Sequence, residues 1–232
     1  MTVVFDLDGT LVDTAEDIGA ALNRALAAFG LPPLPPVAVR RAVGAGGTAL
    51  AQAALARSRA GCAGALDAAD RASASDSVAR LHERYLAEYV RAPVVRTRPY
   101  PGAEAALARL ADAGIRLAVC TNKPQAPALA ILDALGLRSY FAAVAGVGPD
   151  GLRKPDPRHL LAAIEQAGGG TSDAVLIGDT EHDAAAARAA GVPFLRVGFG
   201  YGPPPAPGET VLRHFDELEA ALADLGLRAL AG

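Results

Sequence analysis

The stretch Asp6-Leu7-Asp8-Gly9-Thr10 directly follows a short apolar run, Thr2-Val3-Val4-Phe5. The run has the composition of a buried β-strand, so two carboxylates emerge together where the strand ends. Open α/β sheets bind ligands just beyond the carboxyl ends of their strands. Two like charges held close together repel each other, and a bound cation relieves that repulsion. A simple Asp-Gly turn fits these five residues equally well, so the rest of the chain must decide between the two interpretations.

The composition is that of a globular protein with one large domain, or with one domain and an insertion. The chain has 232 residues, of which 51% are hydrophobic and 20% charged, so it can bury a sizeable core. A net charge of −3 argues against a general nucleic-acid binder, which would carry a basic stripe. We expect a monomer or a homodimer that binds neither nucleic acid nor membranes.

Cysteine content and hydropathy predict a cytoplasmic location. Cys62 and Cys120 lie far apart and form no ligand pattern, which fits a reducing compartment better than a disulfide-linked secreted protein. Cys120 lies in an apolar run and is expected in the core. The first residues do not resemble a signal peptide, and no uninterrupted apolar run reaches the length of about 18 residues that a membrane span needs.

From residue 102 onward, helical and strand patterns alternate. Predicted strands cover 115–120, 142–145, 174–177 and 193–197, and predicted helices cover 102–113, 125–135, 156–167, 181–190 and 215–225. This alternation is typical of βαβ units, which form a parallel sheet. Together with the first strand, it predicts an α/β core built on a doubly wound parallel sheet.

The segment between the first strand and this alternating part is Ala-rich and helical. Thr14 and Asp17 resemble a capping box, apolar residues then repeat at helical spacing, and Gly30 ends the helix. Residues 37–92 continue as helical segments. We therefore expect an inserted α-helical cap that lies over the carboxyl end of the first strand. The predicted boundaries give a core of residues 1–13 and 96–232 and a cap of residues 14–95.

Four polar groups follow predicted strands or open a predicted helix. They are Asp6 with Asp8, Thr121-Asn122-Lys123, Lys154, and the run Gly178-Asp179-Thr180-Glu181-His182-Asp183. The carboxyl ends of parallel strands meet at one edge of a sheet, so we expect these groups to share one crevice. Only two of the 22 basic residues are lysines, Lys123 and Lys154. A lysine retained in so arginine-rich a chain is a candidate for a role that needs a compact ammonium.

The residue types in these groups fit phosphoryl transfer. A carboxylate can attack phosphorus and form an aspartyl-phosphate, and a second carboxyl can protonate the leaving alcohol and then activate water. Carboxylate and carbonyl oxygens suit Mg²⁺. The Thr121 hydroxyl, neighbouring backbone N–H groups and the Lys154 ammonium could hold the phosphoryl oxygens. A chain of net negative charge can thus bind an anionic substrate, because the metal and Lys154 set the local field.

These groups, in this order and with this insertion, resemble the haloacid dehalogenase superfamily of phosphatases, whose core is Rossmann-like. The resemblance covers nearly the whole chain. It implies that Asp6 is the nucleophile and Asp8 the general acid and base. It further implies that Asp6, the backbone carbonyl of Asp8 and Asp179 hold Mg²⁺, with Asp183 supporting the metal site from behind.

The same resemblance assigns the phosphate contacts. It implies that Thr121 and Asn122 contact the phosphate and that Lys154 neutralises the phosphoaspartate. True dehalogenases are similar to this chain but lack a carboxylate two residues after the nucleophile. The presence of Asp8 therefore favours a phosphatase.

The expected substrate depends on resemblances in three loops. Val43-Gly44-Ala45-Gly46-Gly47-Thr48-Ala49-Leu50 resembles the Gly-rich lid loop of phosphoglycolate phosphatases, and Pro99-Tyr100-Pro101-Gly102 and Gly200-Tyr201-Gly202 resemble two further loops of that family. Gly44 and Gly46 are therefore candidate substrate contacts, since Gly lets the backbone approach a ligand closely. An interhelical turn needs glycines as well. The resemblance implies 2-phosphoglycolate or a similar small phosphorylated acid.

Several alternatives stay open at this point. The substrate could instead be N-acetylmuramate 6-phosphate, pyrophosphate or a sugar phosphate, and a sugar-phosphate mutase would keep the same core residues. A non-catalytic regulator on this fold is a more distant alternative. The chain departs from the resembled family in the loop 146–151 and in the proline-rich loop 203–207. These departures bear on the expected substrate more than on the expected reaction.

Overall fold

A computed structural model describes residues 1–44, 46–60, 68–206 and 208–226, with the backbone alone for 58–60 and 68–75. The chain divides into two compact units, one formed by Met1–Asp13 with Arg98–Gly232 and the other by Thr14–Thr97. We refer to them as the core unit and the helical unit. The second boundary lies at 97/98, compared with the predicted 95/96. Cys62 and Pro207 lie outside the described residues.

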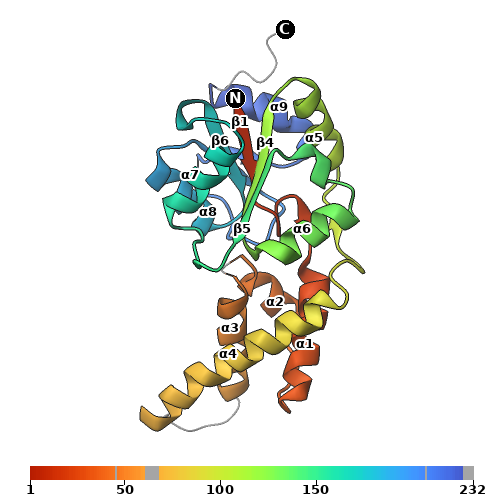
Figure 1. Cartoon of the computed structure of the whole chain (residues 1–232), viewed down its shortest axis with the longest axis vertical. Helices are drawn as coiled ribbons and strands as arrows, with labels where there is room; N and C mark the ends of the chain where they lie inside the picture. The colour runs from red at the N-terminus through yellow and green to blue at the C-terminus, as the bar shows by residue number, and fades with distance from the viewer. Residues whose placement is uncertain (45, 61–67, 207, 227–232) are drawn as a thin grey trace. The chain divides into compact units, whose positions relative to one another are not determined.

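The core unit contains a six-stranded parallel sheet in the order β5-β4-β1-β6-β7-β8 (Figure 1). Its strands are β1 (Thr2–Phe5), β4 (Arg116–Pro124), β5 (Ala143–Val147), β6 (Ala174–Gly178), β7 (Phe194–Val197) and β8 (Val211–Leu212). The predicted parallel α/β sheet is confirmed. β1 lies between β4 and β6, which places the end of the first strand near the middle of the sheet.

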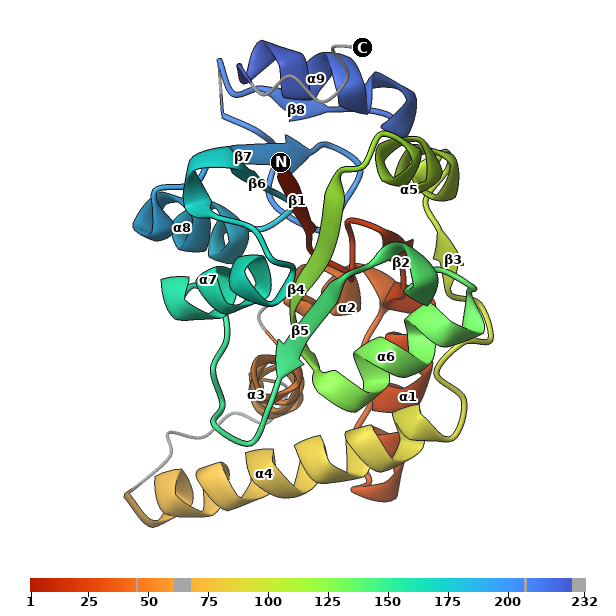
Figure 2. The ribbon, with the colours of Figure 1, turned by 45° about the horizontal axis from the view of Figure 1, so that its top comes forward.

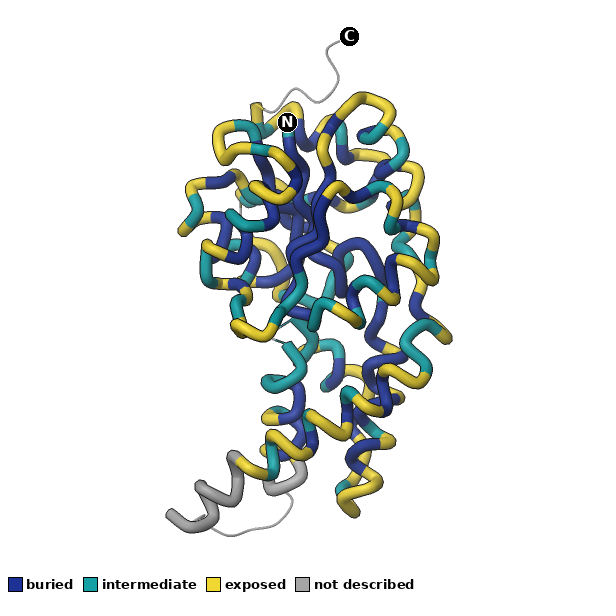
Figure 3. The backbone as a smooth tube through the Cα atoms, in the orientation of Figure 1, coloured by how far each residue is buried: buried dark blue, intermediate teal, exposed yellow. Residues whose placement is uncertain are grey.

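Helices cover both faces of this sheet. They are α5 (Ala103–Asp112), α6 (Gln125–Ala134), α7 (Pro157–Gln166), α8 (Glu181–Ala190) and α9 (Leu218–Asp224), with short 3-10 turns at η1 (Arg138–Tyr140), η2 (Thr171–Asp173) and η3 (Phe215–Glu217). Figure 2 shows α7 and α8 on one side of the sheet and α5 and α6 on the other. Strands buried on both faces need continuous apolar runs. The central strands are accordingly buried throughout, as Figure 3 shows in dark blue.

Cys120 lies in the core, as predicted. It is fully buried in the cluster that joins the sheet to α7 and α8, together with Val4, Leu160 and Leu176. Burial raises the pKa of its thiol to about 12, so the thiol stays protonated and behaves as a small apolar side chain.

Three very short strands were not predicted. β8 extends the sheet at its edge, and β2 (Val12–Asp13) pairs with β3 (Arg98–Pro99) in an antiparallel ribbon. A strand of two residues carries no periodicity that a sequence pattern could reveal. This ribbon contains the last residues of the core unit before the helical unit and the first residues after it.

The helical unit consists of α1 (Ala15–Ala28), α2 (Pro36–Ala42), α3 (Gly47–Ala60) and α4 (Ala68–Val90). α1 buries an apolar stripe that includes Ile18, Leu22 and Leu26, spaced as an amphipathic helix requires. Glu88 of α4 is almost fully buried and forms ion pairs with three arginines, Arg24 of α1 and Arg84 and Arg91 nearby in sequence. In the described part of the chain, no helix combines the length and apolar content that crossing a bilayer requires.

The predicted capping box at Thr14 and Asp17 is wrong. Thr14 occupies the N-cap position of α1, but its side chain makes no capping hydrogen bond. Asp17 instead accepts hydrogen bonds from the backbone N–H groups of Val95, Arg96 and Thr97, at 2.8–2.9 Å, and from the Thr97 hydroxyl at 2.7 Å. Burial opposes ionisation, but these donors outweigh it and hold the pKa of Asp17 below its ordinary value. Asp17 therefore holds residues 95–97 against the start of α1 through these hydrogen bonds.

Replacing Asp17 with Asn should destabilise the protein by about 1–3 kcal/mol, because the four donors around this buried side chain lose a charged acceptor. Stabilisation by Asp17 should be complete above its ordinary pKa of 3.8 and fall as the pH drops through its lower folded-state pKa. Urea unfolding of the full chain measures both effects. The matched control is Glu16→Gln, because Glu16 forms an exposed ion pair with Arg96 that should contribute little. Equal destabilisation by the two variants would contradict this account of Asp17.

Candidate active site

The predicted polar groups converge at the carboxyl edge of three neighbouring strands. Asp6 directly follows β1, and Asp179 directly follows β6. Thr121 and Asn122 lie in the last part of β4, beyond the residues that pair with β1. All four side chains are buried. This arrangement is the one expected where parallel strands end at a common edge.

Lys154 lies at the centre of this cluster. It comes from the loop between β5 and α7, and its side chain is only 2% exposed. Its Nζ lies 2.8 Å from Oδ1 of Asp6 and 2.5 Å from Oδ1 of Asp183, and it donates a hydrogen bond to the carbonyl of Cys120 at 2.6 Å. Burial disfavours the ammonium, but attraction to Asp183 and Asp6 outweighs it, so the pKa of Lys154 lies above its ordinary value.

Asn122 positions the backbone of Lys154. Its Oδ1 accepts a hydrogen bond from the Lys154 N–H at 2.8 Å, and its Nδ2 donates to the Lys154 carbonyl at 3.0 Å. Thr121 lies beside it, with its hydroxyl accepting a hydrogen bond from the N–H of Lys123 at 3.2 Å. The two residues predicted to contact phosphate are thus at the site, and the amide of Asn122 is directed at Lys154.

Three buried carboxylates lie together at this position, and two of them, Asp6 and Asp183, contact the ammonium. One side-chain oxygen from each of Asp6, Asp179 and Asp183 lies within 4.8 Å of the other two. Burial raises the pKa of Asp6 to about 8; Lys154 acts against this shift, while the charges of Asp183 and Asp179 add to it. Burial, reinforced by the charge of Asp183, also raises the pKa of Asp179 to about 6. Three carboxylates around one ammonium carry excess negative charge, and hard oxygen donors of this kind fit Mg²⁺.

Asp179 is held at three of its oxygen atoms. Its Oδ2 accepts hydrogen bonds from the N–H groups of Tyr201 at 2.6 Å and Gly202 at 3.1 Å, and its Oδ1 accepts one from the Thr10 hydroxyl at 3.3 Å. Its main-chain carbonyl accepts a hydrogen bond from Nη1 of Arg196 at 2.9 Å. A Cβ on Gly202 would collide with the Asp179 carbonyl, so this close approach requires glycine. These contacts fix one orientation of the carboxylate.

Asp183 combines two structural roles. Its Oδ2 accepts hydrogen bonds from the N–H and hydroxyl of Thr180, at 3.0 and 2.6 Å, in the capping box that starts α8. Its Oδ1 faces Lys154. The helix cap thus fixes the carboxylate that contacts the ammonium.

Asp8 forms a separate ion pair with Lys123, for which the sequence predicted no specific role in the site. Nζ of Lys123 lies 3.1 Å from both carboxylate oxygens, and both side chains are buried. The scarcity of lysine in the sequence marks Lys123 as a candidate, and both lysines of the chain lie in this site. Arg196, Tyr201 and Thr10 were also missed as site residues.

Gly44 and Gly46 belong to the helical unit, between α2 and α3. Both have positive φ angles, +100° and +93°, which fits a loop that only glycine adopts readily. Residue 45 lies outside the described residues. A contact of these glycines with substrate stays a prediction.

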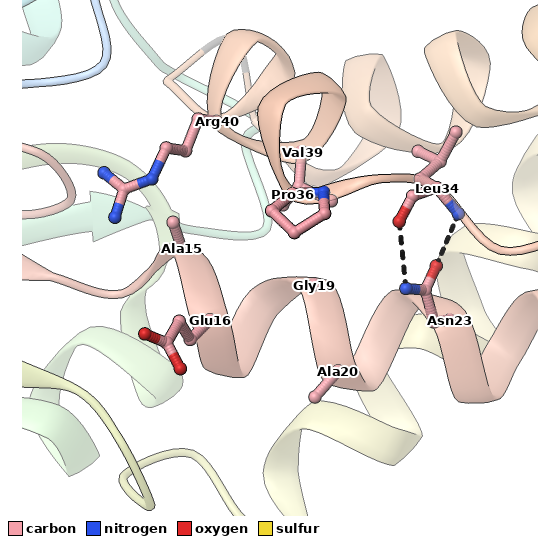
Figure 4. A pocket seen from close by; sticks show the side chains of 9 residues that line it. All are labelled: Ala15, Glu16, Gly19, Ala20, Asn23, Leu34, Pro36, Val39 and Arg40. Atoms are coloured by element: carbon pink, nitrogen blue, oxygen red, sulfur yellow. Dashed lines mark hydrogen bonds between the residues drawn. The ribbon is translucent and has the colours of Figure 1, made fainter.

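The helical unit also contains a pocket of about 320 Å³ between α1 and α2. Figure 4 shows Asn23 on its wall, paired with the backbone of Leu34 through hydrogen bonds of 3.1 and 2.8 Å. Glu16 and Arg40 lie at its other end, and Val39 and Pro36 are among the apolar residues that line it. The carboxylate cluster belongs to the core unit.

A family model described as haloacid dehalogenase-like hydrolase matches residues 1–191 of this chain. The chain belongs to the haloacid dehalogenase-like hydrolases. The resemblance that the sequence motifs suggested is therefore confirmed, and so is the α/β fold class.

Named relatives narrow the activity within the family. The chain is 41% identical to a phosphoglycolate phosphatase from Mesorhizobium japonicum over 98% of this chain and 96% of that protein. It is 43% identical to a phosphoglycolate phosphatase from Rhodospirillum rubrum over 96% and 89%. A crystal structure described as a predicted phosphoglycolate phosphatase from Haemophilus somnus 129pt matches with a TM-score of 0.82 and 26% identity, over 94% of this chain and 95% of that one. This haloacid dehalogenase-like hydrolase is accordingly a phosphatase.

Proposed function

We propose that this phosphatase hydrolyses a small phosphorylated acid, with 2-phosphoglycolate as the preferred substrate, through an aspartyl-phosphate at Asp6 and with Mg²⁺. The observation that carries the proposal is the buried cluster in which Lys154 contacts both Asp6 and Asp183 beside Asp179. Such a cluster offers a nucleophile, a counter-charge and metal ligands within a few ångströms, as phosphoryl transfer requires.

The proposed reaction has two steps. The Asp6 carboxylate attacks phosphorus and forms an acyl phosphate, while the ester P–O bond breaks and the leaving oxygen takes a proton from the Asp8 carboxyl. Asp8 then takes a proton from water, whose oxygen attacks phosphorus. The bond between Asp6 and phosphorus breaks, which releases inorganic phosphate and restores the carboxylate.

The residues proposed to hold Mg²⁺ are Asp6, Asp179 and the backbone carbonyl of Asp8, with Asp183 supporting the site through Lys154 and the start of α8. When bound, Mg²⁺ would offset charge on the phosphoryl oxygens and on the carboxylates. The raised pKa values of Asp6 and Asp179 support this assignment, because a cation would stabilise both carboxylates in their charged form.

We assign Lys154 the role of offsetting charge on the phosphoaspartate, since its ammonium contacts Asp6. Asn122 would then act by orienting the Lys154 backbone, and the Thr121 hydroxyl and neighbouring N–H groups would bind phosphoryl oxygens. Gly44 and Gly46 would contribute backbone contacts to the rest of the substrate.

The preference for 2-phosphoglycolate rests on the names of the relatives, which match nearly the whole chain, and on the Gly-rich loop of the helical unit. A small phosphorylated metabolite is therefore the proposed partner. The low cysteine count, with Cys120 free and buried, supports the further proposal of a cytoplasmic location.

Phosphate release from a panel of small phosphomonoesters, with and without Mg²⁺, tests the substrate. We expect 2-phosphoglycolate to exceed N-acetylmuramate 6-phosphate, pyrophosphate and the sugar phosphates in kcat/KM, with activity lost in EDTA and in an Asp6→Asn blank. Similar kcat/KM values for all esters, with activity that still depends on Mg²⁺ and Asp6, would refute the proposed substrate and support the proposed reaction. Isomerisation of a sugar phosphate without phosphate release would favour a mutase.

The pair formed by Asp8 and Lys123 permits a test that separates catalysis from stability. Asp8→Asn should lower kcat about 10²–10⁴-fold through loss of the acid and base, and should lower stability because Lys123 keeps a buried charge without this partner. The double variant Asp8→Asn/Lys123→Met should recover most of the stability and none of the activity. Measurements of kcat and of urea unfolding on the single and double variants give both quantities. Recovery of activity in the double variant would rule out Asp8 as the acid and base.

A further inference from the structure

The loop after β7 brings a tyrosine to the candidate metal site. The N–H of Tyr201 donates to Oδ2 of Asp179 at 2.6 Å. The phenol of the same residue donates to Oδ1 of Asp13 at 2.6 Å. One half-buried residue thus contacts two carboxylates of the core unit, with its backbone N–H at the candidate site and with its phenol in the β2–β3 ribbon.

The ring of Tyr201 also packs against the turn that carries Asp6 and Asp8. A Cβ on Gly9 would lie 2.8 Å from Cδ2 of Tyr201 and 2.6 Å from Oδ2 of Asp179. Gly9 has a φ of +86°, so glycine is favoured there for its conformation as well as for the space. The acidic turn, Asp179 and the Tyr201 ring are therefore packed directly against one another.

Asp13 is fixed by its place in the ribbon. It pairs with Arg98 across β2 and β3, and it is the last residue of the core unit before the helical unit begins. A hydroxyl donating to a carboxylate is a strong, charge-assisted hydrogen bond. Because the phenol is held at Asp13, the backbone N–H of Tyr201 keeps its position against Oδ2 of Asp179.

We propose that Tyr201 is a positioning residue that fixes the orientation of Asp179 for metal binding and links it, through Asp13, to the ribbon at which the chain enters the helical unit. This inference rests on the proposed function, in which Asp179 holds Mg²⁺. It assigns a role to the Gly200–Gly202 loop that does not involve contact with substrate.

The test is the Mg²⁺ concentration that gives half-maximal activity in Tyr201→Phe, which removes the hydroxyl and keeps the ring. We expect it to rise about fivefold, with KM for the phosphate ester at saturating Mg²⁺ within about twofold of the wild type. Asp13→Ala should match Tyr201→Phe, and Asp13→Asn, which keeps an acceptor, should lie closer to the wild type. The double variant Tyr201→Phe/Asp13→Ala should be no worse than either single variant. Tyr140→Phe, in η1, is the matched control.

A second readout does not depend on turnover. The Mg²⁺ concentration that raises the thermal unfolding midpoint should shift by the same factor in Tyr201→Phe and stay unchanged in Tyr140→Phe. Equal Mg²⁺ requirements in these two variants, in both measurements, would overturn the inference. If the wild type binds Mg²⁺ in the thermal assay but releases no phosphate, the proposed function fails and the thermal comparison still decides the role of Tyr201. Absence of any Mg²⁺ response in the wild type would overturn both.

Discussion

Asp6→Asn is expected to lower kcat by at least about 10⁴-fold while the chain still folds, because an amide cannot replace the carboxylate as a nucleophile. Asn has nearly the volume of Asp, so the buried packing around residue 6 should be retained. Phosphate release with 2-phosphoglycolate measures kcat, and circular dichroism measures folding. Turnover within about tenfold of the wild type would rule out Asp6 as the nucleophile.

The same variant should change the pH dependence of stability in the metal-free protein. The pKa of Asp6 is raised from 3.8 to about 8 by burial, against the attraction of Lys154. The contribution of Asp6 to the free energy of unfolding is therefore fully present below pH 3.8 and is lost as the pH rises through about 8. Asn does not ionise, so Asp6→Asn should gain stability relative to the wild type over this range. Urea unfolding in EDTA at several pH values measures the difference, and Mg²⁺ should reduce it.

Lys154→Met is expected to abolish turnover and to destabilise the protein at pH 7 by about 3–5 kcal/mol. Removing the ammonium leaves the buried carboxylate of Asp183 without this counter-charge, and an uncompensated buried charge is strongly destabilising. Urea unfolding in the presence and absence of Mg²⁺ gives the stability, and phosphate release gives the activity. The loss of stability should grow as the pH rises through about 8, since Asp6 of the wild type then ionises beside Lys154, whereas the variant has no ammonium there.

The matched control for Lys154→Met is Arg158→Met. Arg158 lies at the start of α7 and pairs with Asp156, but its side chain is 75% exposed, so its loss should change stability little. If Lys154→Met were as stable as Arg158→Met, the ammonium would not stabilise the buried carboxylates of the cluster. The charge-offsetting role proposed for Lys154 would then be contradicted.

The sequence predicted the parts of the fold that depend on long, regular patterns. Parallel strands buried on both faces need uninterrupted apolar runs, and such runs are visible at Thr2–Phe5 and Ala174–Gly178. The convergence of Asp6, Lys154 and Asp179 followed from the rule that parallel strands end at one edge. The ribbon of β2 and β3 could not be predicted, because two-residue strands form only when distant segments meet.

Contacts between distant residues account for the remaining differences. Thr14 and Asp17 have the spacing of a capping box, but Asp17 finds its donors at residues 95–97, about 80 positions away. Asn122 follows the predicted strand 115–120 closely, as a phosphate ligand would, yet the structure places it within β4 with its amide bound to the backbone of Lys154. A local sequence pattern shows which side chains can form hydrogen bonds, and the fold decides which partners they find.

The central claim is that phosphate passes through a covalent bond to Asp6. Borohydride added to the enzyme during turnover of 2-phosphoglycolate would reduce an acyl phosphate at this residue to homoserine, which mass spectrometry of the N-terminal peptide detects. We predict homoserine at position 6 in the presence of substrate and Mg²⁺, and unmodified Asp6 when substrate is left out. Steady phosphate release with Asp6 unmodified, or reduction at another carboxylate, would contradict the account.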